Sequence, residues 1–178
     1  MIEVILNDTR WLSTNLEAIA HKSVAVVLAA LGIDVDHAEI AILGCDDVHI
    51  ANLNADFRDK PVATNVLSWP AEERAPAQRG GIPDAPTPGP DGMIELGDIA
   101  ISYDTCVKEA AAAGKSIEGH VTHLIIHGLL HLLGYDHTTD PDAELMERVE
   151  VEILGKLGHD DPYSDSAVIG TALTQRRD

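Results

Sequence analysis

The stretch from residue 120 to residue 137 constrains the fold more than any other part of the chain. Residues 124–133 are seven Leu or Ile, two His and one Gly, without a single Asp, Glu, Lys or Arg. A helix that is apolar on every side must be covered by other elements, so this stretch predicts a helix buried in the core. Five of the nine histidines also lie between residues 120 and 137. Buried imidazoles that share no partner are costly to desolvate, which favours a shared metal ion over simple core packing.

The spacing of three of these histidines is typical of a metal site. His127 and His131 are four residues apart, so they lie on one face of a helix, one turn from each other. Gly134 can adopt the left-handed conformation that ends a helix, and His137 can then reach the same ion from the next turn. Three imidazoles with an open fourth position are the ligand set of a catalytic zinc site, whereas structural zinc sites have four protein ligands. We therefore predict that His127, His131 and His137 bind one metal ion.

The same spacing occurs in the metzincin proteases, H-E-x-x-H-x-x-G-x-x-H, with one difference. Their second position is the glutamate that acts as general base, and this chain has Gly128 there. Without it, the site needs another base, a substrate that carries its own nucleophile, or attack by an oxygen that the metal activates. RNA is a substrate of the second kind, because its 2′-hydroxyl adjoins the scissile phosphate. The pattern therefore favours RNA cleavage over peptide hydrolysis.

The composition limits the other possibilities. A chain of 178 residues is long enough for one domain with a core of its own. Its 12 basic and 30 acidic residues give a formal net charge of −18, which argues against a wide basic face for DNA or another polyanion. Cys45 and Cys106 form no CxxC pair and are expected to be small buried residues, and no segment resembles a secretory signal or a membrane span. We expect a cytoplasmic protein that binds neither membranes nor DNA.

Apolar periodicity and turn residues predict an α+β fold. The expected elements are a strand at 2–7, a helix at 11–31, a strand at 38–43, a helix from 46–47, strands at 65–69 and 94–102, and helices at 104–113, 117–133 and 143–157. We expect one domain over residues 1–163, with a mixed sheet of about four strands, helices mainly on one face and the metal-binding helix buried. Residues 71–92 are rich in Pro and Gly and predict a long surface loop, and residues 164–178 predict a flexible tail.

Residues 127–137, HGLLHLLGYDH, resemble the signature of the YbeY-type endoribonucleases, a family of bacterial rRNA maturation factors. The resemblance extends to residues 53–58, 64–70 and 96–99, in the order that the family has them, and covers the chain to about Tyr163. Two features depart from the family pattern. Many members have Asp at the position of Asn65, and the loop at 71–92 is longer than usual.

The resemblance implies a fold, a metal and a reaction. It implies a single α/β domain with one Zn²⁺ per chain, held by His127, His131 and His137. It implies a single-strand-specific endoribonuclease that matures the 3′ end of small-subunit (16S) rRNA and serves ribosome quality control. The expected partners are single-stranded RNA and the small ribosomal subunit with its proteins. Arg58 and His127 are the residues expected to act in catalysis, Arg58 by contacting RNA phosphate.

Some of these residues also have a purely structural interpretation. From the sequence alone, Arg58 is a surface residue paired with Asp56 or Asp59. Asp98 lies in an apolar strand, where an unpaired carboxylate is costly to bury, so it either accepts hydrogen bonds near the site or caps a neighbouring segment. Asp136 either orients a histidine ligand through its second ring nitrogen or caps the next turn.

We expect the remaining histidines and acidic residues to lie in two kinds of position, near the site and at the surface. His123 lies one turn before His127 and is expected to support the site or line its pocket, without binding the metal. His21, His37, His49, His120 and His159 are expected at the surface, and Glu144, Glu147, Glu150 and Glu152 on a solvated helix face.

The charge of −18 suits an RNA substrate poorly, because binding to a polyanion relies on Lys and Arg. We therefore expect weak intrinsic RNA affinity with strong salt sensitivity, or docking through ribosomal proteins. Two alternatives to the nuclease remain. One is a metzincin-like metalloprotease, which the spacing favours and Gly128 opposes. The other is a non-catalytic ribosome assembly factor with a structural metal, for which a fully ligated ion would be expected.

Overall fold

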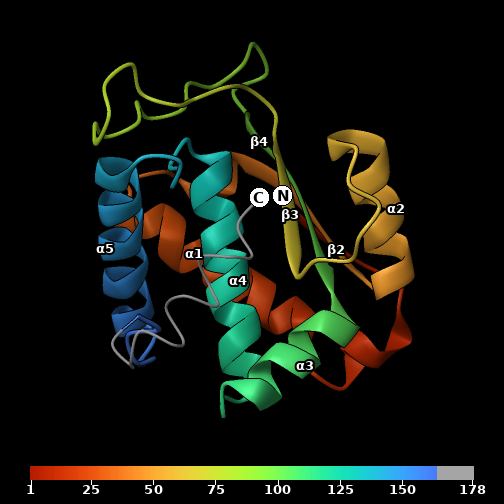
Figure 1. The fold of residues 1–178 in the computed structure, drawn as a ribbon. Coiled ribbons are helices and arrows are strands. Elements are labelled where there is room, and N and C mark those ends of the chain that lie inside the picture. Colours follow the sequence, from red (N-terminus) through yellow and green to blue (C-terminus); the bar gives the residue numbers. More distant parts are fainter. Residues whose placement is uncertain (164–178) are drawn as a thin grey trace.

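The computed structural model describes residues 1–163 and contains every element that the sequence predicts (Figure 1). In chain order the elements are β1 (Ile2–Leu6), the 3₁₀ helix η1 (Thr9–Leu12), α1 (Leu16–Ala30), the 3₁₀ helix η2 (Val35–His37), β2 (Ala38–Cys45), α2 (Asp47–Arg58), β3 (Val66–Pro70), β4 (Ile94–Ser102), α3 (Tyr103–Ala112), α4 (Ile117–Leu132) and α5 (Asp140–Lys156). The predicted helix at 11–31 is in fact two helices. Asn15 takes a left-handed conformation (φ 57°) between η1 and α1, which prevents one continuous helix.

The four strands form one mixed sheet in the order β1-β2-β4-β3. β2 is parallel to both of its neighbours, β1 and β4, whereas β3 is an edge strand antiparallel to β4. The pairing of β2 with β4 shifts by one residue, from Glu39 opposite Glu95 to Ile40 opposite Gly97, so β4 bulges there. Gly97 has φ +135°, and a Cβ at that position would lie 2.1 Å from the Trp69 carbonyl oxygen. The bulge therefore requires glycine.

Helices cover the two faces of the sheet unequally. α1 and α4 pack on one face, and α3 and α5 pack against α4. α2 lies on the other face, where Ile50 packs in a small cluster with Cys45, Leu67 and Ala100 (Figure 1). α4 is buried along almost its whole length. The expected α+β class, with a buried helix and helices mainly on one face, is confirmed.

The helices that surround the site begin at predictable capping residues. Ser116 precedes α4 and accepts a hydrogen bond from the N–H of Gly119. Thr139 precedes α5 and accepts one from the N–H of Asp142, and Pro141 lies in the first turn, where its missing N–H costs nothing. These caps fix where α4 and α5 start, and therefore which of their residues face each other.

The loop after β3 runs over the end of α4 toward the start of α5 (Figure 1). Residues 71–93 contain no helix or strand. The Arg74 guanidinium donates to the carbonyl oxygen of Leu132, at 2.9 Å, and the Gly80 N–H donates to the Asp142 carboxylate, at 2.7 Å. A cation is favourable at a helix C-terminus, where carbonyl groups lack partners. Arg74 therefore ties the loop to α4, close to the predicted metal ligands.

Three sequence predictions concern the chain as a whole. Cys45 and Cys106 are buried and unpaired, as expected. Among residues 1–163, no helix is both long and apolar enough to cross a membrane. The predicted flexible tail at 164–178 lies outside the described residues.

Candidate metal centre

The three predicted ligands come together at the C-terminal end of α4. His127 and His131 lie one turn apart on α4, and His137 follows the turn that ends the helix. Gly134 makes that turn with φ +103°, and a Cβ there would lie 2.4 Å from the carbonyl oxygen of Arg74. Glycine is therefore required twice at this position, by its backbone conformation and by the close approach of the loop.

The spacing of the ring nitrogens fits a tetrahedral metal ion. The Nε2 atom of His131 lies 3.1 Å from that of His127 and 3.1 Å from that of His137. Metal–nitrogen bonds of about 2.0 Å at tetrahedral angles would place such atoms about 3.3 Å apart. The His131 Nδ1 lies 3.0 Å from the carbonyl oxygen of Tyr135, to which only a protonated Nδ1 can donate, so Nε2 keeps a free lone pair. Burial and the charges of His127 and His137 lower the pKa of His131 to about 2, which keeps it neutral and able to bind a metal.

Glu150 supports this group, contrary to the prediction of a solvated position. Its side chain is fully buried. One carboxylate oxygen accepts from the Nδ1 of His127 at 2.5 Å, and the other accepts from the Nε2 of His123 at 3.0 Å and from the Tyr163 hydroxyl. Burial alone would raise the pKa of Glu150, but the charge of His127 and the hydrogen bonds from His123 and His127 outweigh it and lower the pKa. An ionised carboxylate thus fixes the proton of His127 on Nδ1 and leaves Nε2 for the metal.

The sequence contains a signal for Glu150 that its acidic neighbours conceal. On α5, Met146 lies one turn before Glu150, and Ile153 and Leu154 lie one turn after it. All three are buried, so Glu150 occupies a position in the apolar stripe of the helix. A carboxylate in such a stripe must have buried hydrogen-bond donors, and a histidine-rich neighbouring helix supplies them.

The other residues predicted near the site occupy different places. His123 is buried one turn before His127, and burial lowers its pKa although the hydrogen bond to Glu150 opposes this. The Asp136 carboxylate accepts from the backbone N–H of His137, at 2.8 Å, and thus contacts the backbone of a predicted ligand and not its ring. Asp98 is exposed on the sheet face away from α4, so the structure gives it no contact with the histidine group. The alternation of β4 turns Ile99 toward the core and Asp98 away from it.

Arg58 lies at the C-terminal end of α2 and borders the same cavity as His131. This cavity has a volume of about 220 Å³, and Asp136 and Ser68 also line it. The Arg58 guanidinium donates to the carbonyl oxygen of Ser68 at 3.4 Å. Within residues 1–163 it forms no ion pair, with Asp56, Asp59 or any other residue, so the surface-pair interpretation is wrong. Its charge therefore borders the cavity that His131 also lines.

His120 is the one histidine whose predicted surface position is clearly wrong. It is buried, and its Nε2 lies 2.8 Å from a carboxylate oxygen of Glu109. The side-chain amide of Asn65 donates to the same oxygen, at 3.0 Å. An Asp at position 65 would place a second negative charge against Glu109, so the amide suits this arrangement better. The departure of Asn65 from the family pattern therefore has a local structural reason. His21 and His37 are exposed, and His49 and His159 are partly exposed.

Comparison with known proteins agrees with this geometry. Residues 3–158 match the model of the family described as endoribonuclease YbeY. The endoribonucleases YbeY of Ruegeria pomeroyi and Dinoroseobacter shibae are 56% and 51% identical over 163 and 167 residues, which cover 92% and 94% of this chain and 98% and 92% of theirs. The solution structure of TM1509 from Thermotoga maritima, 22% identical, has a TM-score of 0.52 over 94% of this chain and 97% of that chain, so the fold is shared. The resemblance that the sequence motifs indicate is thus confirmed, and the chain belongs to the endoribonuclease YbeY family.

Proposed function

We propose that the chain is a zinc-dependent endoribonuclease that cuts single-stranded RNA, with the 3′ end of small-subunit rRNA as its natural target. The observation that carries the proposal is the group of three histidines together with Arg58, which forms no ion pair among residues 1–163 and shares a cavity with His131. Three protein ligands leave a position open for substrate, which favours a catalytic metal over a structural one. A guanidinium can bind two oxygens of one phosphate, which favours a phosphodiester substrate.

Each residue of the site has a distinct role in this proposal. His127, His131 and His137 would hold Zn²⁺, a Lewis acid that stabilises charge on a phosphoryl oxygen. The carboxylate of Glu150 orients His127, and its oxygens are occupied by hydrogen bonds, so it does not serve as a base for the substrate. Arg58 would hold the phosphate in the cavity that it shares with His131.

The structure also weighs against the metalloprotease alternative. A Cβ at Gly128 would lie 3.2 Å from the Cδ1 of Ile99 on β4, so position 128 faces the core of the protein. A larger side chain there would have to displace the side chain of Ile99 and would point toward β4. This position is therefore poorly placed for the metzincin base.

Cleavage of a labelled single-stranded RNA tests the proposal. His131→Ala should abolish cleavage, because it removes the middle ligand of the group, whereas His21→Ala, at an exposed position on α1, should cleave as the wild type does. A chelator should stop the wild type, and added Zn²⁺ should restore it better than Mg²⁺. Equal cleavage by wild type and His131→Ala would refute the assignment of the activity to this site.

A modified substrate separates the two chemical routes that the site allows. An RNA with a single 2′-O-methyl group at the cleaved nucleotide lacks the hydroxyl that could attack the phosphate. Loss of cleavage at that bond alone would identify the 2′-hydroxyl as the nucleophile. Continued cleavage would identify water as the nucleophile, activated by the metal or by another base.

We also propose that the protein acts in the cytoplasm on the small ribosomal subunit and depends on it for docking. The formal net charge of −18 leaves few cations to bind a long RNA. In a ribosomal particle, contacts between this protein and ribosomal proteins would bring the RNA to the site, and isolated RNA lacks these contacts. Cleavage of isolated RNA should therefore fall steeply with salt, and cleavage within the particle should fall less. Equal salt dependence of both would contradict docking by the particle.

A further inference from the structure

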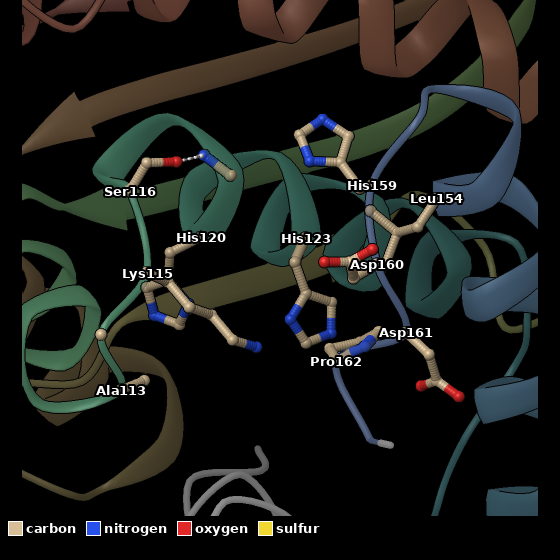
Figure 2. Close-up of a pocket in the computed structure, with 12 residues that line it drawn as sticks. Ala113, Lys115, Ser116, His120, His123, Leu154, His159, Asp160, Asp161 and Pro162 are labelled. Carbon is tan, nitrogen blue, oxygen red and sulfur yellow. Dashed lines mark hydrogen bonds between the residues drawn. The ribbon is translucent and has the colours of Figure 1, made fainter. Parts of the chain in front are cut away.

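A second polar cavity lies at the N-terminal end of α4 (Figure 2) and shares no residue with the cavity of Arg58 and His131. Its volume is about 330 Å³, which is within the size range of small-molecule sites. His123 forms part of its wall and lies four residues before His127. With a rise of about 1.5 Å per residue, the cavity is about 6 Å along the helix from the first predicted ligand. The two cavities therefore lie on either side of the histidine group.

One end of this cavity suits an anion. Lys115 and Ser116 lie there, at the N-terminus of the 16-residue helix α4 (Figure 2). The side-chain ammonium of Lys115 forms no hydrogen bond or ion pair with any residue from 1 to 163. The partial positive charge of a helix N-terminus adds to that of the lysine. A phosphate group at this end would contact both the ammonium of Lys115 and the N-terminus of α4.

His123 adds an observation that is independent of the helix end. Its side chain is only 6% exposed, and its Nδ1 is buried without a hydrogen-bond partner. The Nε2 of His123 lies 3.0 Å from an oxygen of Glu150, whereas Nδ1 has no partner, so the proton belongs on Nε2 and Nδ1 is a bare acceptor. Figure 2 shows the His123 ring between the two ends of the cavity, with the Lys115 side chain extending toward it. This nitrogen requires a donor from a ligand or a water molecule.

The opposite end of the cavity is acidic. Asp160 and Asp161 lie there, and one Asp161 oxygen accepts from the backbone N–H of Tyr163 (Figure 2). Among the described residues, the groups close enough to share a metal ion both include His127, so His159 and these aspartates do not form such a group. A ligand with an anionic group at one end and hydroxyl or amino donors at the other would match the polarity of the cavity.

We propose that this cavity binds one ribonucleotide of the RNA substrate, next to the nucleotides at the histidine group. Its phosphate would contact Lys115 and the N-terminus of α4, and its 2′-hydroxyl would donate to the Nδ1 of His123. The 2′-hydroxyl is the group by which a protein distinguishes RNA from DNA, so this cavity would contribute to substrate choice. The inference rests on the proposed function, because it takes RNA as the substrate.

Mononucleotide binding to the zinc-loaded protein tests this inference without requiring cleavage. Adenosine 5′-monophosphate is titrated while the backbone amide NMR signals of residues 115–120 are followed. These signals should shift, and 2′-deoxyadenosine 5′-monophosphate should bind about fivefold more weakly, as the loss of one neutral hydrogen bond predicts. Lys115→Met should weaken binding of the ribonucleotide about tenfold or more, because it removes a contact between opposite charges. Lys22→Met, an exposed position on α1, is the control of equal charge change and should bind as the wild type does.

The possible outcomes distinguish this inference from the proposed function. Absence of shifts at residues 115–120, or equal binding by Lys115→Met and Lys22→Met, would refute the phosphate site. Equal binding of the ribonucleotide and the deoxyribonucleotide would refute the contact with His123. If the mononucleotide binds as expected but RNA is not cleaved, the proposed nuclease activity fails and the nucleotide site remains.

Discussion

Replacement of Glu150 by Gln is expected to weaken metal binding although Glu150 touches no metal ligand atom. The amide has the same shape as the carboxylate, but it replaces one acceptor oxygen by an NH₂ donor. In the protein, one oxygen faces the Nδ1 of His127 and the other faces His123 and Tyr163, all of which donate. With the NH₂ toward His127, a donor faces a donor, and His127 can relieve this only by moving its proton to Nε2, the atom that the metal needs. With the NH₂ toward His123 and Tyr163, the hydroxyl can accept and His123 can move its proton to its unpartnered Nδ1, but only a neutral amide oxygen then holds the proton of His127.

The size of the effect follows from this competition for the proton of His127. Loss of the carboxylate behind a metal-binding histidine typically weakens metal affinity about 10- to 100-fold. At about 1.4 kcal/mol for each factor of ten, this corresponds to about 1.4 to 2.8 kcal/mol. The complete burial of Glu150 leaves no water to take its place, so we expect a value toward the upper end.

A competition titration of Zn²⁺ against a chromophoric chelator measures this change. Glu152→Gln is the matched control, because Glu152 lies on the same helix and is exposed. Circular dichroism of the metal-free variants separates loss of metal affinity from loss of fold. Zinc affinity of Glu150→Gln equal to that of wild type would refute the argument that the carboxylate sets the protonation of His127.

Three further predictions concern the turn, the arginine and the pH dependence. Gly134→Ala should lower the free energy of unfolding by about 2 kcal/mol or more, because the left-handed φ and the nearby carbonyl oxygen both oppose a Cβ. Gly155→Ala is the control and should raise the free energy of unfolding slightly, because it lies in α5 with no heavy atom within 4 Å of an added Cβ. A denaturant titration in which the two variants are equally stable would contradict this. Arg58→Ala should reduce the rate of RNA cleavage about 10- to 100-fold with zinc affinity unchanged, while the exposed Arg79→Ala should not, and equal rates would remove Arg58 from the mechanism. In metal-free protein the pKa of His131 is lowered to about 2, so at pH 5 this residue stays neutral when folded and is protonated when unfolded. The free energy of unfolding should therefore fall by about 2 kcal/mol between pH 7 and pH 5 because of this residue. A urea midpoint that does not fall over this range would contradict the prediction.

Local patterns in the sequence were sufficient to predict most of the fold. The strand predicted at 94–102 and the helix predicted at 117–133 agree with β4 and α4 to within one residue. Cap residues and apolar periodicity determine such elements, and both are visible in the sequence. The order of the strands in the sheet is not visible in the sequence, because it depends on contacts between distant segments. The sequence indicated a mixed sheet, but not that β3 is the antiparallel edge.

The three histidines of the site were also predictable, because the helical repeat and one glycine bring them together. The residues that hold these histidines in place could not be predicted in the same way. Glu150 is on a different helix and lies among exposed acidic residues in the sequence, so only its place in the apolar stripe distinguishes it. His120 was assigned to the surface because its partner Glu109 lies on another helix. The apolar neighbours of Asp98 do not reveal that its side chain is exposed, because only one face of the strand is buried where Asp98 lies.

The compact placement of the three ligands within residues 127–137 has a consequence for the order of folding. These histidines can meet as soon as one helix and the turn after it have formed, which is a local event that takes microseconds or less. Glu150 and Tyr163 come later in the chain and must be brought in by packing of α5. During synthesis, the three predicted ligands therefore leave the ribosome before the carboxylate that orients His127. The three histidines can be together on the nascent chain, whereas the orientation of His127 by Glu150 follows only when α5 has docked.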